Sequence, residues 1–224
     1  MKMYVFFFFI FLLAVTHCAQ GKIEKCDRKI DLAVVLDVSG SIKEENLSLA
    51  KKFAKTLLRR FRISRDNVRV SLVAYSESVK IYSAFEDDQE EEGLERKVNN
   101  VFFEGSSTAT SKCLTILNSR LFVQESGSRI KEPDVRKVAV VVTDGFSFIG
   151  PGIVKLRADE LKKRGIEVFA IGITKRMGDD ELINLSSKPV QKHFLRLTDK
   201  DSIERITDNI VQEICKEGNY FPQI

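Results

Sequence analysis

Three runs of nearly continuous apolar residues stand out along the chain, and all are rich in β-branched side chains. They cover residues 30–36, 138–143 and 166–173. Runs of this length without polar alternation are typical of strands that are buried on both faces of a parallel sheet. Residues 44–62 instead repeat apolar side chains every three or four positions, which predicts an amphipathic helix with one buried face.

The rest of the chain follows the same two patterns. Further strands are expected at residues 68–75, 79–82 (a short edge strand) and 193–197. Further helices are expected at residues 90–103, 111–122, 153–164, 179–185 and 201–215. Because strands and helices alternate, we expect an α/β fold, with a doubly wound, mostly parallel sheet flanked by helices on both faces.

The first residues indicate a targeting signal. Lys2 precedes an apolar run from Met3 to Val15, which is shorter than the roughly 20 residues that a membrane span needs. Ala19-Gln20-Gly21 fits a cleavage site between small residues. We therefore expect a signal peptide at 1–21, a secreted chain that starts at Lys22, and no membrane anchor.

Length and charge narrow the class of protein. The secreted chain would hold an N-terminal segment (22–29), one domain (30–215) and a short tail (216–224). The full chain has 36 basic and 32 acidic residues, and the signal peptide takes one basic residue with it. This balance is too close to neutral to indicate nucleic acid as a partner.

A cluster of oxygen side chains follows the first apolar strand, in Asp37-Val38-Ser39-Gly40-Ser41. Such residues would lie at the carboxyl edge of a parallel sheet, where open α/β folds bind ligands. Hard divalent cations prefer oxygen ligands, so a metal site is one interpretation. The other is structural, since the run from Ser41 to Glu44 also fits a capping box that only opens the next helix.

Two distant segments favour the metal interpretation. Residues 105–110 form a loop of small and hydroxyl-bearing residues, and the strand 138–143 is followed by Asp144 and Gly145. Two apolar strands that end in Asp, with a hydroxyl-rich loop between them in sequence, indicate one composite site.

These segments resemble the von Willebrand factor type A domain and its metal-ion-dependent adhesion site. The resemblance covers about residues 26–215. It departs from the family at Ser111 and Cys113, where the family usually has Gly and Ala beside the site. The resemblance implies a Rossmann-like fold and five metal-site residues, namely Asp37, Ser39, Ser41, Thr108 and Asp144.

The family likeness also implies a chemistry. Three neutral hydroxyls and two carboxylates would neutralise Mg²⁺ (or Mn²⁺ or Ca²⁺) only in part, and the ion would keep an exchangeable position. A carboxylate from an extracellular protein ligand could then complete the coordination shell. We expect matrix proteins or sulfated glycans as partners.

The cysteines and the sequons add further expectations. Cys18 leaves with the signal peptide, and the resemblance implies a terminal bridge between Cys26 and Cys215. Cys113 would then be a buried, inert thiol. Asn46 and Asn184 head N-glycosylation sequons, which many secreted chains leave unused.

Enzyme signatures are missing from the sequence. His193, the one histidine after the signal peptide, is expected on a strand facing solvent or a neighbour. We therefore expect a secreted adhesion module, not an enzyme. The alternative is a structural protein of a matrix or secreted coat that associates without metal. The basic residues of 51–65 would form a solvated helix face or a patch for sulfated glycans.

The family likeness has one consequence for regulation. In relatives that switch affinity, the final helix slides along the sheet and the metal loop rearranges. A bridge from Cys26 to Cys215 would strain such a slide, so we expect a site close to one fixed affinity state.

Overall fold

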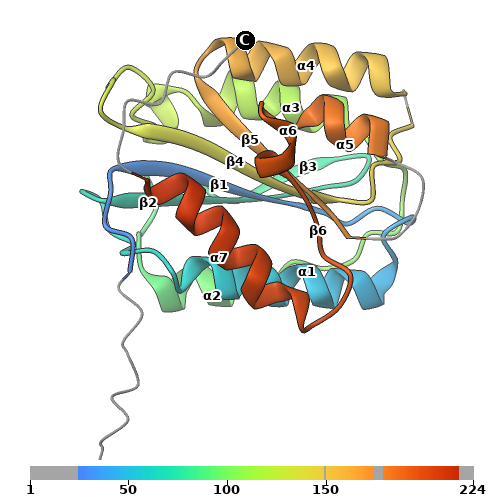
Figure 1. Ribbon diagram of the computed structural model, residues 1–224, viewed down its shortest axis with the longest axis horizontal. Helices are drawn as coiled ribbons and strands as arrows, with labels where there is room; N and C mark the ends of the chain where they lie inside the picture. The colour runs from blue at the N-terminus through green and yellow to red at the C-terminus, as the bar shows by residue number, and fades with distance from the viewer. Residues whose placement is uncertain (1–24, 149, 174–178, 217–224) are drawn as a thin grey trace, which may run out of the picture.

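The computed structural model describes residues 25–148, 150–173 and 179–216, so the predicted signal peptide and most of the tail lie outside it. A six-stranded sheet crosses the molecule in the order β3-β2-β1-β4-β5-β6 (Figure 1). Its strands are β1 (Ile30–Asp37), β2 (Val68–Tyr75), β3 (Val79–Ser83), β4 (Arg136–Thr143), β5 (Ile166–Gly172) and β6 (Phe194–Arg196).

The two most apolar strands lie at the centre of the sheet. β1 pairs in parallel with both β2 and β4, and every one of its side chains is buried. Only the edge strand β3 is antiparallel to its neighbour. The predicted fold class, a doubly wound and mostly parallel sheet, is confirmed.

Helices cover both faces of this sheet (Figure 1). Alternate residues of β1 divide between two cores: Leu32, Val34 and Leu36 pack in one, and Ala33 and Val35 in the other. The first core lies against α1 (Lys43–Leu58), α2 (Glu91–Asn99) and α7 (Ser202–Cys215), and the second against α3 (Thr110–Ile116), α4 (Pro151–Lys163) and α5 (Asp179–Leu185). None of the described helices is long and apolar enough to cross a membrane.

Four predicted elements differ from the structure. The helices expected at 44–62 and 90–103 end at Leu58 and Asn99, and the one expected at 111–122 continues beyond α3 as a π-helical turn, Leu117–Leu121. His193 does not belong to a strand but ends the short helix α6 (Val190–His193). Its Nε2 lies 2.6 Å from Oε1 of Glu167, so this buried polar contact replaces the expected strand position.

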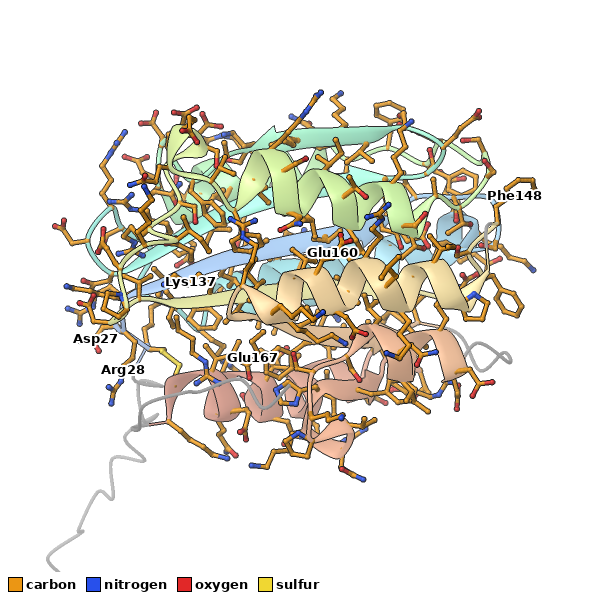
Figure 2. All side chains as sticks on the ribbon, turned by 90° about the horizontal axis from the view of Figure 1, so that it is seen from above. Asp27, Arg28, Lys137, Phe148, Glu160 and Glu167 are labelled. Carbon is orange, nitrogen blue, oxygen red and sulfur yellow. A yellow bond between two sulfur atoms is a disulfide. The ribbon has the colours of Figure 1, made fainter. Side chains whose placement is uncertain are left out.

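The cysteines follow the expected pairing in the structure. Cys26 and Cys215 form a disulfide that joins the segment before β1 to the end of α7, across 189 residues of chain. Cys113 is an unpaired, buried thiol on α3, and burial raises its pKa. The disulfide lies at the end of the molecule where Asp27 and Arg28 are also found (Figure 2).

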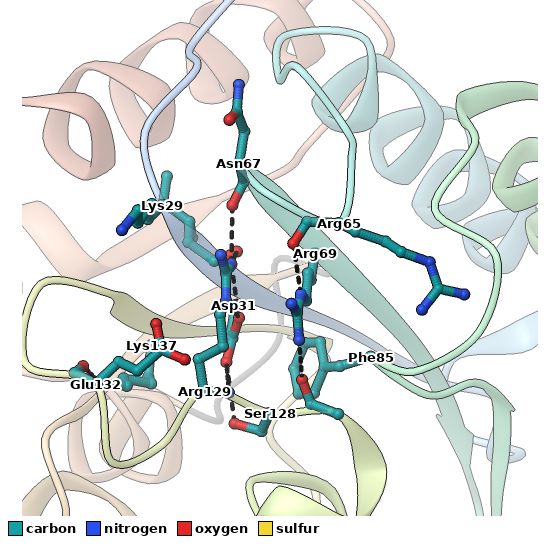
Figure 3. A network of polar contacts seen from close by, with 12 residues as sticks. Lys29, Asp31, Arg65, Asn67, Arg69, Phe85, Ser128, Arg129, Glu132 and Lys137 are labelled. Carbon is teal, nitrogen blue, oxygen red and sulfur yellow. Dashed lines mark hydrogen bonds and ion pairs between the residues drawn. The ribbon is translucent and has the colours of Figure 1, made fainter.

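That end of the sheet also holds a buried ion pair (Figure 3). Asp31 on β1 is fully buried, and Arg129 donates to it from Nε at 2.9 Å and from its backbone N–H at 2.6 Å. Ser128 Oγ adds a third donor at 3.0 Å. Nη2 of Arg129 donates to the backbone carbonyls of Ile30 and Asn67, and Nη1 to that of Asp66, which ties the loop around residue 129 to the sheet.

A second network holds the end of α7. Arg136 at the start of β4 forms a paired contact with the buried Glu167, at 2.7 and 2.9 Å. Its third nitrogen donates to the carbonyls of Glu213 and Ile214 in the last turn of α7. The negative end of the helix is thus capped by a guanidinium close to the disulfide.

Candidate functional site

The opposite, carboxyl edge of the sheet gathers the predicted site residues. Asp37 ends β1, and Asp144 follows directly after β4, its neighbour in the sheet. Ser39 and Thr108 lie in the loops beside them. All four side chains are less than 6 % exposed, although each stands at or beyond the end of its element.

The three predicted hydroxyls lie within hydrogen-bonding distance of one another. Thr108 Oγ1 donates to Ser39 Oγ at 2.8 Å, Ser39 Oγ lies 3.2 Å from Ser41 Oγ, and Ser41 Oγ lies 3.4 Å from Thr108 Oγ1. Oxygens on neighbouring corners of an octahedron around Mg²⁺, each about 2.1 Å from the ion, would stand about 3 Å apart. The spacing of the hydroxyls therefore fits one face of a Mg²⁺ coordination shell.

The carboxylate of Asp37 is buried among neutral donors. It accepts hydrogen bonds from the backbone N–H of Ser39 at 2.9 Å, from Thr143 Oγ1 at 2.7 Å and from Tyr75 OH at 3.4 Å. Burial raises its pKa to about 6, and the charge of Asp144 adds to this, while the hydrogen bonds act in the opposite direction. A nearby divalent cation would favour the ionised form of both carboxylates.

A close approach of two loops brings Thr108 to the site. The backbone N–H of Gly40 donates to the carbonyl of Ser106 at 2.8 Å. A Cβ atom at position 40 would lie only 2.8 Å from the carbonyl oxygen of Gly105, so a larger residue would push the loops apart. Gly40 is needed for this contact and not merely for flexibility.

The structure contradicts the capping interpretation of Ser41. The residue at the N-cap of α1 is Ile42, and no side chain caps that helix end. The hydroxyl of Ser41 instead lies beside Ser39 and Thr108. Lys43 follows with a φ of 63°, a conformation that is uncommon for residues other than glycine and often found near functional sites.

Sequence reasoning missed a second group of polar residues behind the site. Tyr75 OH lies 3.4 Å from Thr110 Oγ1 and joins it to Asp37. Glu181 on α5 is 3 % exposed and accepts a hydrogen bond from the backbone N–H of Ser147. Burial, with the charges of Asp37 and Asp144, raises the pKa of Glu181 to about 7. Glu181 lies far from these residues in sequence, so no local pattern could have identified it.

Two exposed aromatic side chains flank the site. Phe146 is 43 % exposed and Phe148 is 84 % exposed, and both follow Asp144. Their backbone is held in place, because Phe146 N–H donates to Asp144 Oδ1 and Phe148 N–H donates to the carbonyl of Thr108. Phe148 projects from the end of the molecule opposite Asp27 (Figure 2).

The two sequons lie on helices α1 and α5. Asn46 is half-buried on α1, and its Nδ2 donates to the carbonyl of Ile42 at 2.8 Å. Asn184 is half-buried near the end of α5 and lines a groove against α4. Glycosylation at either position stays a prediction.

Within the part of the chain that the structure describes, no three His, Cys, Asp or Glu side chains are placed to hold a metal together. The predicted metal site instead combines two carboxylates with three hydroxyls. Such a set would leave a dication with net positive charge, unlike a calcium-storage loop rich in carboxylates.

Comparison with known proteins agrees with this architecture. The family model of the von Willebrand factor type A domain matches residues 31–209. Human matrilin-1 is 30 % identical over 187 residues, which are 84 % of this chain and 36 % of matrilin-1. Mouse matrilin-2 is 28 % identical over 89 % of this chain and 20 % of its own length. The mouse collagen alpha-6(VI) chain is 29 % identical over 88 % of this chain and 8 % of its own length. This chain thus spans well under half of each relative.

A solved structure shares the fold as well. Proximal thread matrix protein 1 from the mussel byssus superimposes with a TM-score of 0.76 at 24 % identity, over 86 % of this chain and 49 % of that one. Another structure of the same mussel protein, with a TM-score of 0.75, has a metal-ion-dependent adhesion site occupied by zinc.

The relatives also indicate where the protein is found. They are structural proteins of the extracellular matrix, and this protein is secreted and extracellular as they are. The match of the family model over most of the chain, together with the shared fold, leads to one conclusion: the chain belongs to the von Willebrand factor type A domain family.

Proposed function

We propose that this protein is an extracellular adhesion module that binds a carboxylate of a protein ligand through Mg²⁺ or a similar divalent cation. The observation that carries the proposal is the triangle of hydroxyls from Ser39, Ser41 and Thr108, with sides of 2.8 to 3.4 Å. Asp37 and Asp144 would add the negative charge, directly or through water. When bound, the ion would supply an electrophilic position for a ligand oxygen.

The surroundings of the site favour a protein as the ligand. Phe146 and Phe148 present apolar surface beside the proposed metal position. Exposed aromatic side chains next to a buried polar centre are common where one protein binds another. A small anion would leave both rings in contact with water.

The proposal also assigns no catalytic role to the site. Proton-transfer catalysis needs a general base within reach of the substrate. Neither His193 nor Glu181 is open to a substrate: His193 is buried against Glu167 at the other end of the sheet, and Glu181, behind the site, is 3 % exposed. The family relatives are structural matrix proteins, which supports a role in binding instead of hydrolysis.

The test is calorimetric titration of purified protein with Mg²⁺, followed by capture of matrix proteins with Mg²⁺ or with EDTA. Wild-type protein should bind one Mg²⁺, and Asp37→Ala should abolish that binding while the protein stays folded. Asp27→Ala is the matched control, because Asp27 is exposed at the opposite end. Equal Mg²⁺ binding by wild type and Asp37→Ala would contradict the proposal.

A second candidate function is structural assembly without metal. The edge strand β3 favours it, since Ile81 on that strand is 37 % exposed and nearby Phe102 is 54 % exposed. Exposed strand edges can pair with other chains. Self-association that persists in EDTA would support this function, and capture of a partner only with Mg²⁺ would support the first.

A further inference from the structure

A groove separates helices α4 and α5 on one side of the sheet. It has a volume of about 340 Å³, within the range of pockets that bind small ligands, roughly 300–1,000 Å³. Both helices cover the same face of the sheet (Figure 1). None of the five proposed metal ligands lines it. Its lining comprises Lys155, Asp159, Lys162, Lys163, Ile183, Asn184, Ser186, Lys188 and Val190.

The charge of the groove is strongly unbalanced. Asp159 is the single carboxylate among the four lysines of the lining. It is already shared, because Lys155 approaches one of its oxygens at 2.6 Å and Lys162 the other at 2.9 Å. Among the described residues, neither Lys163 nor Lys188 forms an ion pair. Positive charge thus remains on both walls of the groove.

Lys162 fixes the geometry of the groove instead of serving as its open cation. Its ammonium is half-buried and donates to the carbonyls of Asn184 and Ser186 at the end of α5. Burial lowers its pKa, the contact with Asp159 acts in the opposite direction, and the charges of Lys155 and Lys188 also lower it. These like charges are close enough to interact, and an anion between them would relieve the repulsion.

We propose that this groove binds a sulfated glycan. The exposed ammonium groups of Lys163 and Lys188 would contact sulfate groups, while Ile183 and Val190 give the lining an apolar surface for a sugar ring. The protein is extracellular, where glycan sulfates are available as polyanions. The proposal does not rest on the metal site, and chelation should leave this binding unchanged.

The basic face of α1 is a weaker candidate for the same ligand, because its charges are used within the fold. Lys51 and Lys55 donate to Asn99 at the end of α2, and Arg59 pairs with Glu95 at 2.6 Å. Arg60 pairs with acidic residues of α7. These contacts join helices and reduce the charge that α1 presents to a partner.

Asn184 belongs both to the groove and to a glycosylation sequon. It lines the groove and also heads a sequon, so an N-glycan attached there would occupy the space that the proposed ligand needs. Attached carbohydrate and bound polyanion would then exclude one another.

The experiment is calorimetric titration of unglycosylated protein in EDTA with a heparin-derived hexasaccharide. The same hexasaccharide without sulfate and inorganic sulfate are separate arms. We expect binding of the sulfated hexasaccharide alone, and at least a tenfold loss in Lys163→Gln/Lys188→Gln. Asn184→Phe, which fills the groove without changing the charge, should lose binding to a similar extent.

The matched control removes two exposed lysines elsewhere, in Lys52→Gln/Lys131→Gln. This variant should change the affinity less than threefold, and circular dichroism should show that all variants remain folded. Equal losses in both double variants would overturn the proposal in favour of diffuse charge attraction. A larger loss in the control, binding of the unsulfated sugar, or binding of inorganic sulfate as tight as that of the hexasaccharide would also overturn it.

Discussion

Asp31 and Asp37 lie on the same strand, both are buried, and an even spacing places them on the same face of the sheet. Asp31 is paired with the guanidinium of Arg129. Asp37 receives only hydroxyl and N–H donors, and burial raises its pKa to about 6. A buried carboxylate without a cation is costly. The chain itself therefore supplies a cation to Asp31, whereas the surroundings of Asp37 are suited to a cation from solution.

The same contrast extends to the two ends of the sheet. At the amino end, Arg136 joins Glu167 to the last turn of α7, and the Cys26–Cys215 disulfide lies close by. At the carboxyl end, hydroxyls meet carboxylates and Phe148 projects into solvent. One end holds the fold together, and the proposed binding site lies at the other, where open α/β sheets generally bind a ligand.

Removal of Arg129, the cation that pairs with Asp31, should have the largest effect on the stability of the protein. Arg129→Ala would leave Asp31 buried without its partner and free the surrounding loop. We expect a loss of roughly 3–5 kcal/mol in the free energy of unfolding, the usual effect of breaking a buried pair. Urea unfolding measures this, with the exposed neighbour Lys131→Ala as control. A loss below about 1 kcal/mol would show that the pair does not hold this end.

Opening the disulfide should have the next largest effect. The bridge closes a loop across 189 residues, and removal of a native disulfide typically costs about 2–5 kcal/mol. Cys26→Ser/Cys215→Ser should therefore unfold at lower urea concentration than oxidised wild type. Wild type treated with a reductant should approach the double variant. Identical curves for oxidised wild type and the variant would contradict the expected contribution.

At the other end of β1, Asp37→Asn should stabilise the metal-free protein at pH 7. The folded-state pKa of Asp37, about 6, lies above its ordinary value of 3.8. The stability that its protonated form contributes is therefore complete below about pH 3.8 and is lost as the pH rises through about 6. The shift corresponds to at most about 3 kcal/mol.

Unfolding curves in EDTA between pH 4 and pH 7 test this sign. Relative to Asp37→Asn, wild type should lose stability over that range, whereas Asp27→Asn should follow wild type. Mg²⁺ at 100 times its dissociation constant should then return about 2.7 kcal/mol to wild type and to Asp27→Asn, but not to Asp37→Asn. A constant difference between wild type and Asp37→Asn at all pH values would refute the assignment.

The contrast between the ends also explains what the sequence could predict. Asp37 and Asp144 were predictable because each directly follows an apolar strand, and parallel strands end at one edge. Arg129 was not, since it reaches Asp31 from a loop 98 residues away and no periodicity marks it. Likewise, Glu181 and His193 take their roles from contacts with Ser147 and Glu167 that arise only on folding. Local patterns predict elements and edges, while long-range pairing depends on the packed structure.

The smallest expected effect is that of the disulfide on Mg²⁺ binding at the opposite end of the sheet. The predicted single affinity state requires α7 to stay in place, and the structure holds this helix by more than the disulfide. Arg60 pairs with Glu204 at 2.5 Å and with Asp208 at 3.1 Å, and Arg136 donates to the last carbonyls of the helix. Because these contacts survive without the bridge, Cys26→Ser/Cys215→Ser should change the Mg²⁺ dissociation constant by less than tenfold, or about 1.4 kcal/mol.

Calorimetric titration of the folded double variant with Mg²⁺ tests this expectation. A larger change would mean that the bridge biases an equilibrium between two positions of α7. A stricter test adds Arg60→Ala to the same variant, since this removes the ion pairs of α7 with Arg60 without touching a proposed metal ligand. If the Mg²⁺ affinity still stays constant, the position of α7 does not act on the loops of Ser39 and Thr108. The two ends of β1 would then be independent, one specialised for stability and the other for binding.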